Sequence, residues 1–536
     1  MSQRFLLKEL CRYATGTWAD IIYRNALLYP DREAFISGEE RLTFAQFNLR
    51  VNRLVHALHS LGLQKGDGVG VLAWNRLEYP ILYGAAMKGG FILSPFNPRL
   101  QAGELEYLIR YSEVSVLFVG SDLAAIASEL RPRLPEIPNF VSLDGPRPDM
   151  ADYRELLAGQ PEAEPDVQVT EDDPYVIFYT SGTTGTPRGA LYAQGRNIHH
   201  TRTRVILLNL VTGDKHVMIL PLFHVGGTSQ FWAFFYIGGS NVILSERSFD
   251  PGATLRTIQN ECATDIHIVP THLVSLLAAP EIENCDLGSL KRMWYAASPM
   301  PTELLRRGME RFGPIFMQGY GQSESGPDIT FLSMASHDVL DRPAEEQHVL
   351  ASCGQPCPGV HARVVDDAGS DVAPGAVGEI VVQGKSLMLE YWRRPEETRE
   401  VFEGGWLHTG DLAYYDESGH LYIVGRKKEM IITGGENVYP REVEEVLYKH
   451  PAVLEAAVIG LPDPVWVERV HAVIVLREGG AVDTGALIQF CKQHLASYKA
   501  PKSIELVTHL PKNPQGKILK REIKARYAPP EPGRSS

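Results

Sequence analysis

The chain has 536 residues, of which 44% are hydrophobic and 22% charged, and its formal net charge is −13. The length predicts two or three domains, and the composition is that of a globular protein and excludes general disorder. The acidic balance argues against nucleic acid as a partner, because phosphate binding requires a basic surface, and six scattered cysteines do not predict a disulfide framework.

The N-terminal stretch MSQRFLLKELCRYATGTW has an apolar run that is interrupted by Lys8, Glu9 and Arg12. It is therefore too short for a signal peptide or a membrane span. A helix packed on the core is favoured over one that lies on a membrane. No run of about 18 apolar residues occurs in the sequence, which predicts no transmembrane segment and a cytoplasmic protein.

Short β-branched runs then alternate with stretches of helical periodicity along most of the chain. This alternation favours an α/β fold with largely parallel sheets. The strand-like runs are 68–74, 114–120, 241–246 and 265–270, and examples of the helical stretches are 45–62 and 251–263.

Residues 378–384 and 405–425 look like hairpins and predict a small β-rich subdomain. Beyond them, about a hundred residues of renewed alternation are enough for a separate small domain. The predicted division is a large N-terminal domain over 1–425, a hinge over 426–428, a small mobile α/β C-terminal domain over 429–525, and a disordered tail over 526–536.

Residues 179–190, YTSGTTGTPRGA, combine three glycines with a series of hydroxyl side chains and one arginine, Arg188. They follow the buried-strand pattern VIFYT, and open α/β sheets bind ligands at strand ends. Glycines let the backbone approach a ligand, and successive N–H groups form a concavity for anions. The loop is neither a Walker A motif nor a dinucleotide fingerprint. It predicts a phosphate-binding loop, with an ordinary surface loop as the alternative.

Other segments carry side chains suited to nucleotide chemistry. A tyrosine ring such as Tyr320 can stack on a purine, and a carboxylate such as Glu324 can hold phosphate-bound Mg²⁺. Asp411, at a predicted strand end, can accept the hydroxyls of a ribose. The ordinary alternatives are a satisfied core histidine for His224, a turn aspartate for Asp411 and a solvated lysine for Lys517.

Taken together, these motifs resemble the adenylate-forming superfamily of acyl- and aryl-CoA synthetases, adenylation domains of peptide synthetases and firefly-type luciferases. The resemblance extends from TWADIIYRNALLYPDREAF to GKILKREI. The stretch GRKKEMIITGGENVYPREVEEVLYKHPAV is most similar to the acyl-CoA synthetase branch. This implies an AMP-forming acid–CoA ligase that uses ATP, Mg²⁺ and coenzyme A. A carboxylate would attack the α-phosphorus of ATP to give an acyl-adenylate, and a thiol would then displace AMP.

The resemblance also implies roles for single residues. The glycine–hydroxyl loop would hold the β- and γ-phosphates, with Arg188 where the family has lysine, and Ser323 stands where threonine is common. The expected catalytic residues are Lys517, Glu324, Arg426 and His224. Thr180 and Glu324 are expected at the metal. The residues expected to bind ATP and CoA are Thr180, Ser181, Gly182, Thr183, Thr184, Gly185, Arg188, Ala297, Ser298, Tyr320, Gly321, Ser323, Asp411, Lys428, Gly434, Gly435 and Glu436.

In the family the C-terminal domain rotates between the two steps, and the hinge matches Lys428. Rotation would withdraw Lys517 after adenylation and bring residues 433–440 in to line the thiol channel. His224 resembles a residue near the acyl carboxylate that shifts between the steps.

The pocket for the acid is expected to be apolar, because residues 223–235 are rich in aromatics and glycines and carry no lone charge. A medium- or long-chain fatty acid fits first, and an aryl, phenylpropanoid or alicyclic acid is the alternative. An acyl-AMP ligase that loads a carrier protein and a non-catalytic ligand-binding homologue are less favoured. The partners would be the acid, ATP and CoA, and the chain could form a homodimer. The expected pocket residues are Phe223, His224, Gly226, Gly227, Trp232, Gly319 and Gly321.

Overall fold

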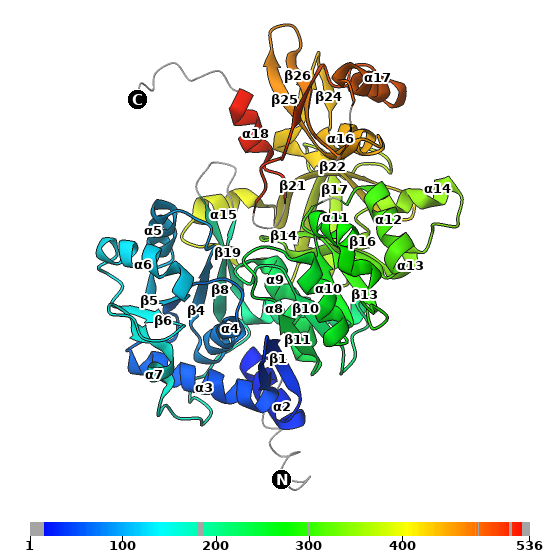
Figure 1. Cartoon of the computed structure of the whole chain (residues 1–536). Coiled ribbons are helices and arrows are strands. Elements are labelled where there is room, and N and C mark those ends of the chain that lie inside the picture. Colours follow the sequence, from blue (N-terminus) through cyan, green and yellow to red (C-terminus); the bar gives the residue numbers. More distant parts are fainter. Residues whose placement is uncertain are drawn as a thin grey trace.

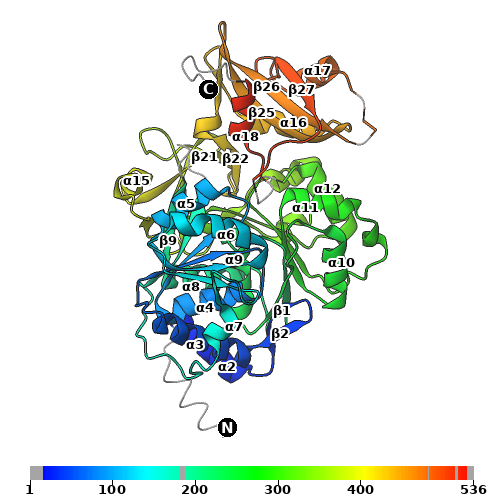
Figure 2. The same ribbon diagram turned by 60° about the vertical axis from the view of Figure 1, so that its left-hand side comes forward.

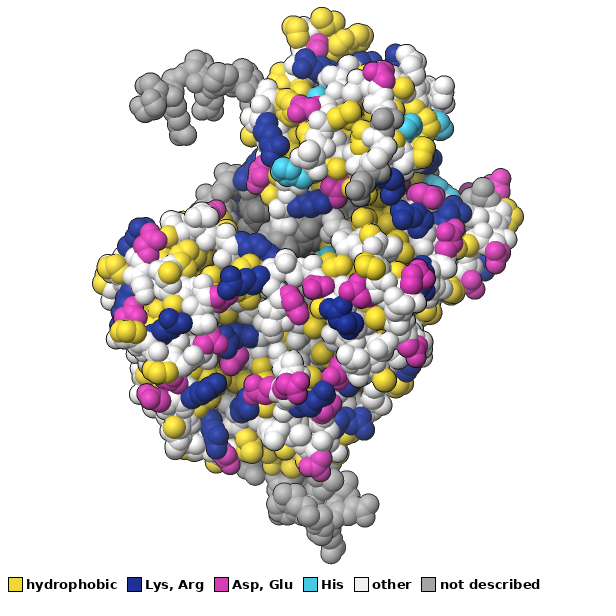
Figure 3. Space-filling model, viewed as in Figure 1, with side chains coloured by type: hydrophobic (Ala, Val, Ile, Leu, Met, Phe, Trp, Pro, Cys, Tyr) yellow, Lys and Arg dark blue, Asp and Glu magenta, His cyan; other side chains and the backbone are white. Residues whose placement is uncertain are grey.

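The computed structural model describes residues 16–180, 187–298, 300–477, 479–480, 482–513 and 517–527. In this part of the chain, two large sheets with their helices form one body, which carries a β-rich unit and a small C-terminal α/β unit (Figures 1 and 2). The C-terminal unit sits above strands β21 (Trp406–Tyr415) and β22 (Leu421–Arg426). Figure 3 shows side chains of both charges interspersed on one face, and a hollow between the C-terminal unit and the large body.

The first large sheet runs in the order β19-β9-β8-β4-β3-β5-β6-β7. Its central strands are parallel, and every residue of β3 is buried, as expected where both faces of a parallel sheet are covered. The strands are β3 (Gly68–Leu72), β4 (Ile92–Phe96), β5 (Val114–Val119), β6 (Asn139–Ser142), β7 (Ala151–Asp152), β8 (Pro174–Thr180), β9 (Arg188–Ala193) and β19 (Glu390–Tyr391).

The second large sheet runs in the order β16-β15-β14-β13-β12-β10-β11-β1-β2 and is parallel from β14 to β1. Its edges turn antiparallel, at β15 on one side and at β2 on the other. The strands are β1 (Glu33–Ser37), β2 (Glu40–Thr43), β10 (Lys215–Met218), β11 (Ser240–Ile243), β12 (Asp265–Ile268), β13 (Arg292–Tyr295), β14 (Phe316–Gln322), β15 (Gly326–Leu332) and β16 (Gln355–Pro356).

The helices of this body begin where the sequence supplies N-caps. Thr17 and Thr43 each form a capping box with the residue three positions later, and Asp250 caps a helix that opens with Pro251. The helices are α2 (Trp18–Leu28), α3 (Phe44–Ser60), α4 (Glu78–Gly89), α5 (Ala102–Tyr111), α6 (Ala124–Leu130), α7 (Tyr153–Leu157), α8 (Gln194–Leu207), α9 (Val225–Tyr236), α10 (Pro251–Asn260), α11 (Pro270–Ala278), α12 (Thr302–Phe312), α13 (Met334–His337) and α14 (Ala344–Gln347).

The β-rich unit is an antiparallel sheet in the order β17-β18-β21-β20, with β22 paired to β21. It contains both predicted hairpin stretches. Its further elements are β17 (Val360–Val365), β18 (Gly378–Gly384), β20 (Phe402–Glu403) and α15 (Pro395–Val401).

The C-terminal unit follows a 3₁₀ turn at Lys427–Glu429. A long β25–β26 hairpin forms its centre, and β27 adds to β26 in parallel. Its elements are β23 (Ile431–Thr433), β24 (Glu436–Val438), α16 (Pro440–Tyr448), β25 (Val453–Asp463), β26 (Val467–Leu476), α17 (Thr484–His494), β27 (Ser503–Val507) and α18 (Lys520–Tyr527).

The predicted fold class is confirmed: a large N-terminal α/β body with a β-rich unit precedes a small α/β unit. The predicted boundaries stay a prediction, and the predicted tail from residue 526 overlaps the end of α18 at Tyr527. The expectation for the N-terminal stretch falls largely outside the described residues. Among the helices that the structure describes, none has the length and apolarity needed to cross a membrane.

Candidate active site

Asp411 is the centre of a hydrogen-bonded group that joins the second large sheet to the β-rich unit. The Tyr320 hydroxyl donates to Oδ2 of Asp411 at 2.7 Å, and Gln322 Nε2 donates to the same oxygen at 2.6 Å. Arg426 Nε lies 2.9 Å from the other carboxylate oxygen, because β21 and β22 pair Asp411 with Arg426 in register. The negative charge of Asp411 raises the pKa of Arg426.

Lys517 belongs to the C-terminal unit, yet its ammonium lies within the electrostatic reach of Asp411. Burial lowers the pKa of Lys517, and the charge of Arg426 lowers it further, while Asp411 and Glu429 act in the opposite direction. The backbone of Lys517 is held in place by Asn513, which accepts its N–H at the side-chain oxygen and donates to its carbonyl, both at 2.8 Å. The structure therefore brings together Tyr320, Asp411, Arg426 and Lys517, which come from different strands and loops.

Glu324 and Arg188 lie on either side of Tyr391, a residue that the sequence analysis did not single out. The Tyr391 hydroxyl donates to Glu324 Oε1 at 2.9 Å, and the Arg188 guanidinium lies 5.2 Å from the centre of the Tyr391 ring. Arg188 also forms an ion pair with Glu397 at the start of α15. Arg188, which was predicted to face a triphosphate, therefore has its charge balanced by the carboxylate of Glu397.

Several predicted nucleotide contacts fall outside the described residues. Thr180 is the last residue of β8 and is described. The loop residues Ser181, Gly182, Thr183, Thr184 and Gly185 are not described.

The segment that contains Ala297 and Ser298, predicted to contact ATP or CoA, follows β13 and has an unusual backbone. Ala297 has a φ of 71°, a left-handed conformation that is uncommon for a residue other than glycine, and Ser298 follows it. Strained backbone of this kind concentrates at ligand sites. Ser323 is buried, and its carbonyl accepts a hydrogen bond from the Tyr192 hydroxyl at 2.6 Å.

His224 is the N-cap of α9, and its Nδ1 accepts the N–H of Gly226 at 3.1 Å. Burial lowers the pKa of His224 to about 4, so the ring is neutral at pH 7 and carries its proton on Nε2. Gly227 allows this turn, since a Cβ there would lie 2.0 Å from the Pro221 carbonyl oxygen.

Trp232 was predicted to line the pocket for the acid, but it lies in the core. Its side chain has no exposed surface and packs against Trp18 and Phe231, with ring centroids 4.4 and 4.5 Å apart. A side chain held in an aromatic core does not close a pocket entrance. The apolar periodicity of α9 is that of a core helix, which the sequence analysis interpreted as a pocket lining.

The turn at Gly434 and Gly435 joins β23 to β24, and both glycines adopt positive φ. Gly434 N–H donates to the Trp466 carbonyl at 2.8 Å, and Glu436 is exposed. Within the described residues, no hydrogen bond or ion pair joins this turn to Tyr320 or Asp411. Lys428 lies in the 3₁₀ turn between the two units.

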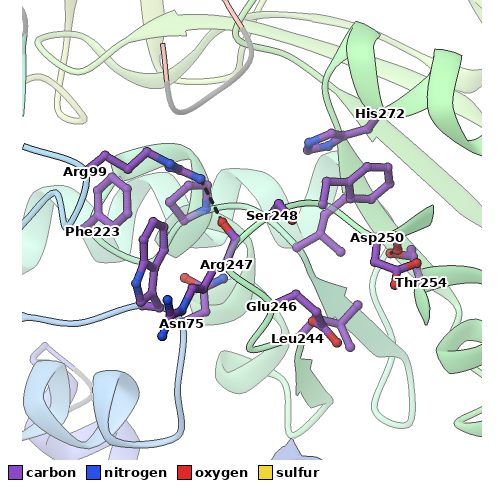
Figure 4. Close-up of a pocket in the computed structure, with 14 residues that line it drawn as sticks. Asn75, Arg99, Phe223, Leu244, Glu246, Arg247, Ser248, Asp250, Thr254 and His272 are labelled. Atoms are coloured by element: carbon purple, nitrogen blue, oxygen red, sulfur yellow. Dashed lines mark hydrogen bonds between the residues drawn. The ribbon is translucent and has the colours of Figure 1, made fainter. Parts of the chain in front are cut away.

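A cavity of about 60 Å³ opens beside Phe223, next in sequence to His224 (Figure 4). Arg99 reaches across it, with its guanidinium 4.8 Å from the centre of the Trp74 ring and Nη2 donating to the Arg247 carbonyl at 3.2 Å. Burial lowers the pKa of Arg99. The cavity is lined by Arg99 and Arg247 and by the carboxylates of Glu246 and Asp250, and it lies close to the residues expected at the acid.

Comparison with known proteins agrees with this arrangement. Residues 22–392 match the family described as AMP-binding enzyme, and residues 442–517 match the AMP-binding enzyme C-terminal domain. A feruloyl-CoA synthase of Amycolatopsis sp is 36% identical over 513 residues, which cover 96% of this chain and 99% of that protein. The medium/long-chain-fatty-acid–CoA ligase FadD8 of Mycobacterium tuberculosis is 34% identical, with 93% and 88% covered.

Among solved structures, the anthranilate CoA ligase AuaEII in complex with anthranoyl-AMP superposes with a TM-score of 0.88 and 28% identity, over 97% of this chain and 98% of that one. The matches extend over both the large body and the C-terminal unit. The chain belongs to the family of AMP-binding enzymes, in the acyl-CoA synthetase branch of the adenylate-forming superfamily.

Proposed function

We propose that this enzyme, an AMP-forming acid–CoA ligase, converts a carboxylic acid with a hydrophobic body to its CoA thioester through an acyl-adenylate. The grouping of Tyr320, Asp411, Arg426 and Lys517 carries the proposal, because it places an aromatic ring and a carboxylate suited to a nucleoside beside a partly buried cation. ATP, Mg²⁺ and CoA are the requirements of such ligases.

In the first step, Lys517 would bind the acid carboxylate and the α-phosphate together. Two anions must meet, and a fixed ammonium offsets their repulsion and the charge that develops in the transition state. Asp411 would accept the ribose hydroxyls in exchange for part of its present contacts, with Tyr320 beneath the adenine. Holding the two reactants in line supplies much of the remaining acceleration.

The residues present fit a magnesium ion bound to phosphate. Glu324 commits Oε1 to Tyr391, which leaves its second oxygen for a metal, and Thr180 offers a hydroxyl at the end of β8. No cluster of three or more His, Cys, Asp or Glu suited to a metal occurs in the described ranges. Phosphate oxygens and water would supply the other ligands, as is usual for Mg²⁺. The ion would offset the charge of the triphosphate.

In the second step, the CoA thiol attacks the acyl carbonyl and AMP leaves. The short turn at Lys427–Glu429 is a suitable hinge for the C-terminal unit, since rotation there would withdraw Lys517 and bring the Gly434–Glu436 turn inward. The cavity beside Phe223 would hold the anionic part of CoA against Arg99. His224, neutral at pH 7, follows Phe223 of this cavity in sequence and caps α9.

The relatives act on both fatty and aromatic acids by their names, so they leave fatty, aryl and phenylpropanoid acids open for this chain. The test of the proposed function is pyrophosphate release from ATP and Mg²⁺ across fatty, benzoic, cinnamic and cyclohexane carboxylic acids, with and without CoA. Turnover with one acid class and formation of its CoA ester are expected. Release of acyl-AMP that never requires CoA would point to a different acceptor, and no release would refute the proposal.

A further inference from the structure

We infer that the acid carries a neutral hydrogen-bonding substituent, such as a phenol hydroxyl, at the end remote from its reacting carboxylate. Buried polar atoms of Gln230, His267 and Trp294 that have no hydrogen-bond partner, here called the cluster, would recognise it. This inference rests on the proposed function, because the cluster lies behind the stretches expected to bind the acid.

A charge-balanced triad of Arg204, Asp328 and His200 borders the cluster. Arg204 has no exposed surface, and its Nε and Nη2 donate to the two carboxylate oxygens of Asp328, each at 2.8 Å. Nη1 of Arg204 donates to the Ser229 hydroxyl at 2.6 Å, and His200 Nε2 donates to Asp328 at 2.7 Å. A buried ion pair is weak evidence for stability, because desolvation offsets the attraction.

The charges of the triad cancel. Burial alone would raise the pKa of Asp328, but the charge of Arg204 outweighs it, so the carboxyl is ionised and its pKa lies well below the usual range. Burial lowers the pKa of His200, which is therefore neutral at pH 7. One positive and one negative charge remain, and a charged substituent on the acid would find no free countercharge in the triad.

The three residues of the cluster carry polar atoms without partners in the described structure. Both ring nitrogens of His267, Nε1 of Trp294 and Oε1 of Gln230 make no hydrogen bond, although the three side chains are at most 3% exposed. Burial lowers the pKa of His267, so its ring is neutral and offers one donor and one acceptor. Buried polar groups are nearly always paired in native proteins, so these atoms call for a partner from a ligand or from water.

The cluster adjoins both stretches expected to hold the acid. His267 and Trp294 are paired in register on β12 and β13, with ring centroids 6.4 Å apart, and the Arg204 guanidinium lies 4.8 Å from the centre of the Trp294 ring. A Cβ on Gly319 would lie 2.2 Å from the Trp294 ring, so the β14 backbone leading to Tyr320 rests on this indole. Gln230 follows Ser229, one turn beyond Gly226 on α9.

A hydroxyl suits this cluster because it can donate to one group and accept from another, as the neutral His267 ring and the Trp294 N–H require. An aliphatic chain would bury the same atoms and leave them unpaired, which is how a polar site rejects an apolar ligand. A compact ring with a polar substituent therefore fits better than a long alkyl chain.

The experiment compares kcat/KM for cinnamic acid, 4-hydroxycinnamic acid and decanoic acid in pyrophosphate release by the whole enzyme. We expect the hydroxylated acid to be preferred by at least about 10-fold, because a site that hydrogen-bonds a hydroxyl discriminates strongly against its absence. W294F keeps an aromatic ring and removes the N–H. In this variant, kcat/KM for 4-hydroxycinnamic acid is expected to fall by about 10-fold, while the values for the other two acids stay unchanged. W406F, on the β-rich unit, is the matched control and is expected to keep the preference.

Equal turnover of the three acids, or a preference for decanoic acid, would overturn the inference. An equal fall in kcat/KM for all acids in W294F would also overturn it. That result would mean that Trp294 has a purely structural role and that water pairs the polar atoms of the cluster. Direct titration of the acids by intrinsic fluorescence separates this inference from the proposed function. One outcome would support the inference but refute the proposed ligase function: no acid is turned over, yet 4-hydroxycinnamic acid binds at least 10-fold more tightly than cinnamic acid, and W294F removes the difference. Without selective binding, both fall.

Discussion

Tyr320 and Asp411 are 91 positions apart in sequence, and the hydroxyl of the first donates to the carboxylate of the second at 2.7 Å. This bond joins the second large sheet to the β-rich unit. Gln322 also donates a hydrogen bond to Oδ2 of Asp411, and Arg426 pairs with Oδ1. The proposed nucleotide site is thus built across two units of the chain, and its shape depends on their packing.

The first prediction concerns this carboxylate. Replacing Asp411 by asparagine keeps its volume but leaves the Arg426 cation without its partner and weakens the bond to a ribose. A hydrogen bond to a charged group contributes about 1.5–3 kcal/mol, so KM for ATP should rise by about 10-fold or more. ATP–pyrophosphate exchange measures it. D371N, at an exposed aspartate that pairs with Arg363, is the control and should keep the wild-type value; an unchanged KM in D411N would contradict the assignment.

The second prediction separates the half-reactions. K517A should lose adenylation by 100-fold or more, on the order of 3 kcal/mol, because a partly buried cation beside the reacting anions is removed. It should still form the CoA ester from preformed acyl-AMP, since Lys517 is withdrawn in that step. K512A, which removes a neighbouring lysine paired with Glu455, is expected to support both steps. Equal loss of both half-reactions in K517A would refute the proposed domain rotation.

The third prediction concerns the cavity beside Phe223. R99A should raise KM for CoA by about 10-fold and leave the first-turnover burst of pyrophosphate unchanged, because the guanidinium is proposed to meet only the acceptor. R393A removes an exposed arginine that pairs with Glu113 and should change neither value. A slower burst in R99A would place the residue in the first step instead.

The fourth prediction follows from the placement of Trp232. W232F should lower the free energy of unfolding by about 1–3 kcal/mol, because the indole is fully buried among aromatic rings. The order of preference among acids should not change. Thermal midpoints and kcat/KM for the acid panel measure the two effects. A changed order of kcat/KM among the acids, with an unchanged thermal midpoint, would instead show that Trp232 lines the acid pocket.

The fifth prediction is a loss of stability in acid. Burial lowers the pKa of His337 to about 4 and that of His216 to about 3, while both would titrate near 6.5 in the unfolded chain. The unfolded state therefore binds more protons between these values, and stability falls as the pH drops from about 6.5 to 4, by up to about 1.4 kcal/mol per pH unit for each histidine. Unfolding midpoints against pH measure it. H337Q should flatten the dependence, and H361Q, at an exposed histidine, should leave it unchanged.

The part of the site that could be predicted from sequence is the part that depends on local pattern. Glycines and hydroxyls after a strand and Lys517 were recognisable because a motif keeps its spacing along the chain. Asp411 was recognised by the same spacing, but the prediction that it stands at a strand end was wrong, because it lies within β21. Tyr391, Glu397 and Gln322 were missed, since nothing near them in sequence marks their contacts with Glu324, Arg188 and Asp411.

The sequence by itself determined the order of strands and helices, the fold class and the family, because hydrophobic periodicity and motif spacing are local properties. Only the tertiary structure decided which charges are paired and which polar groups are left without partners. Arg204 and Asp328 meet across 124 residues, in the layer between α8, α9 and the second sheet. The sequence of residues 223–235 predicted only an apolar pocket and gave no sign of this ion pair, because Arg204 lies on α8 and Asp328 on β15. Contacts of this kind depend on how the layers stack, and no local pattern encodes them.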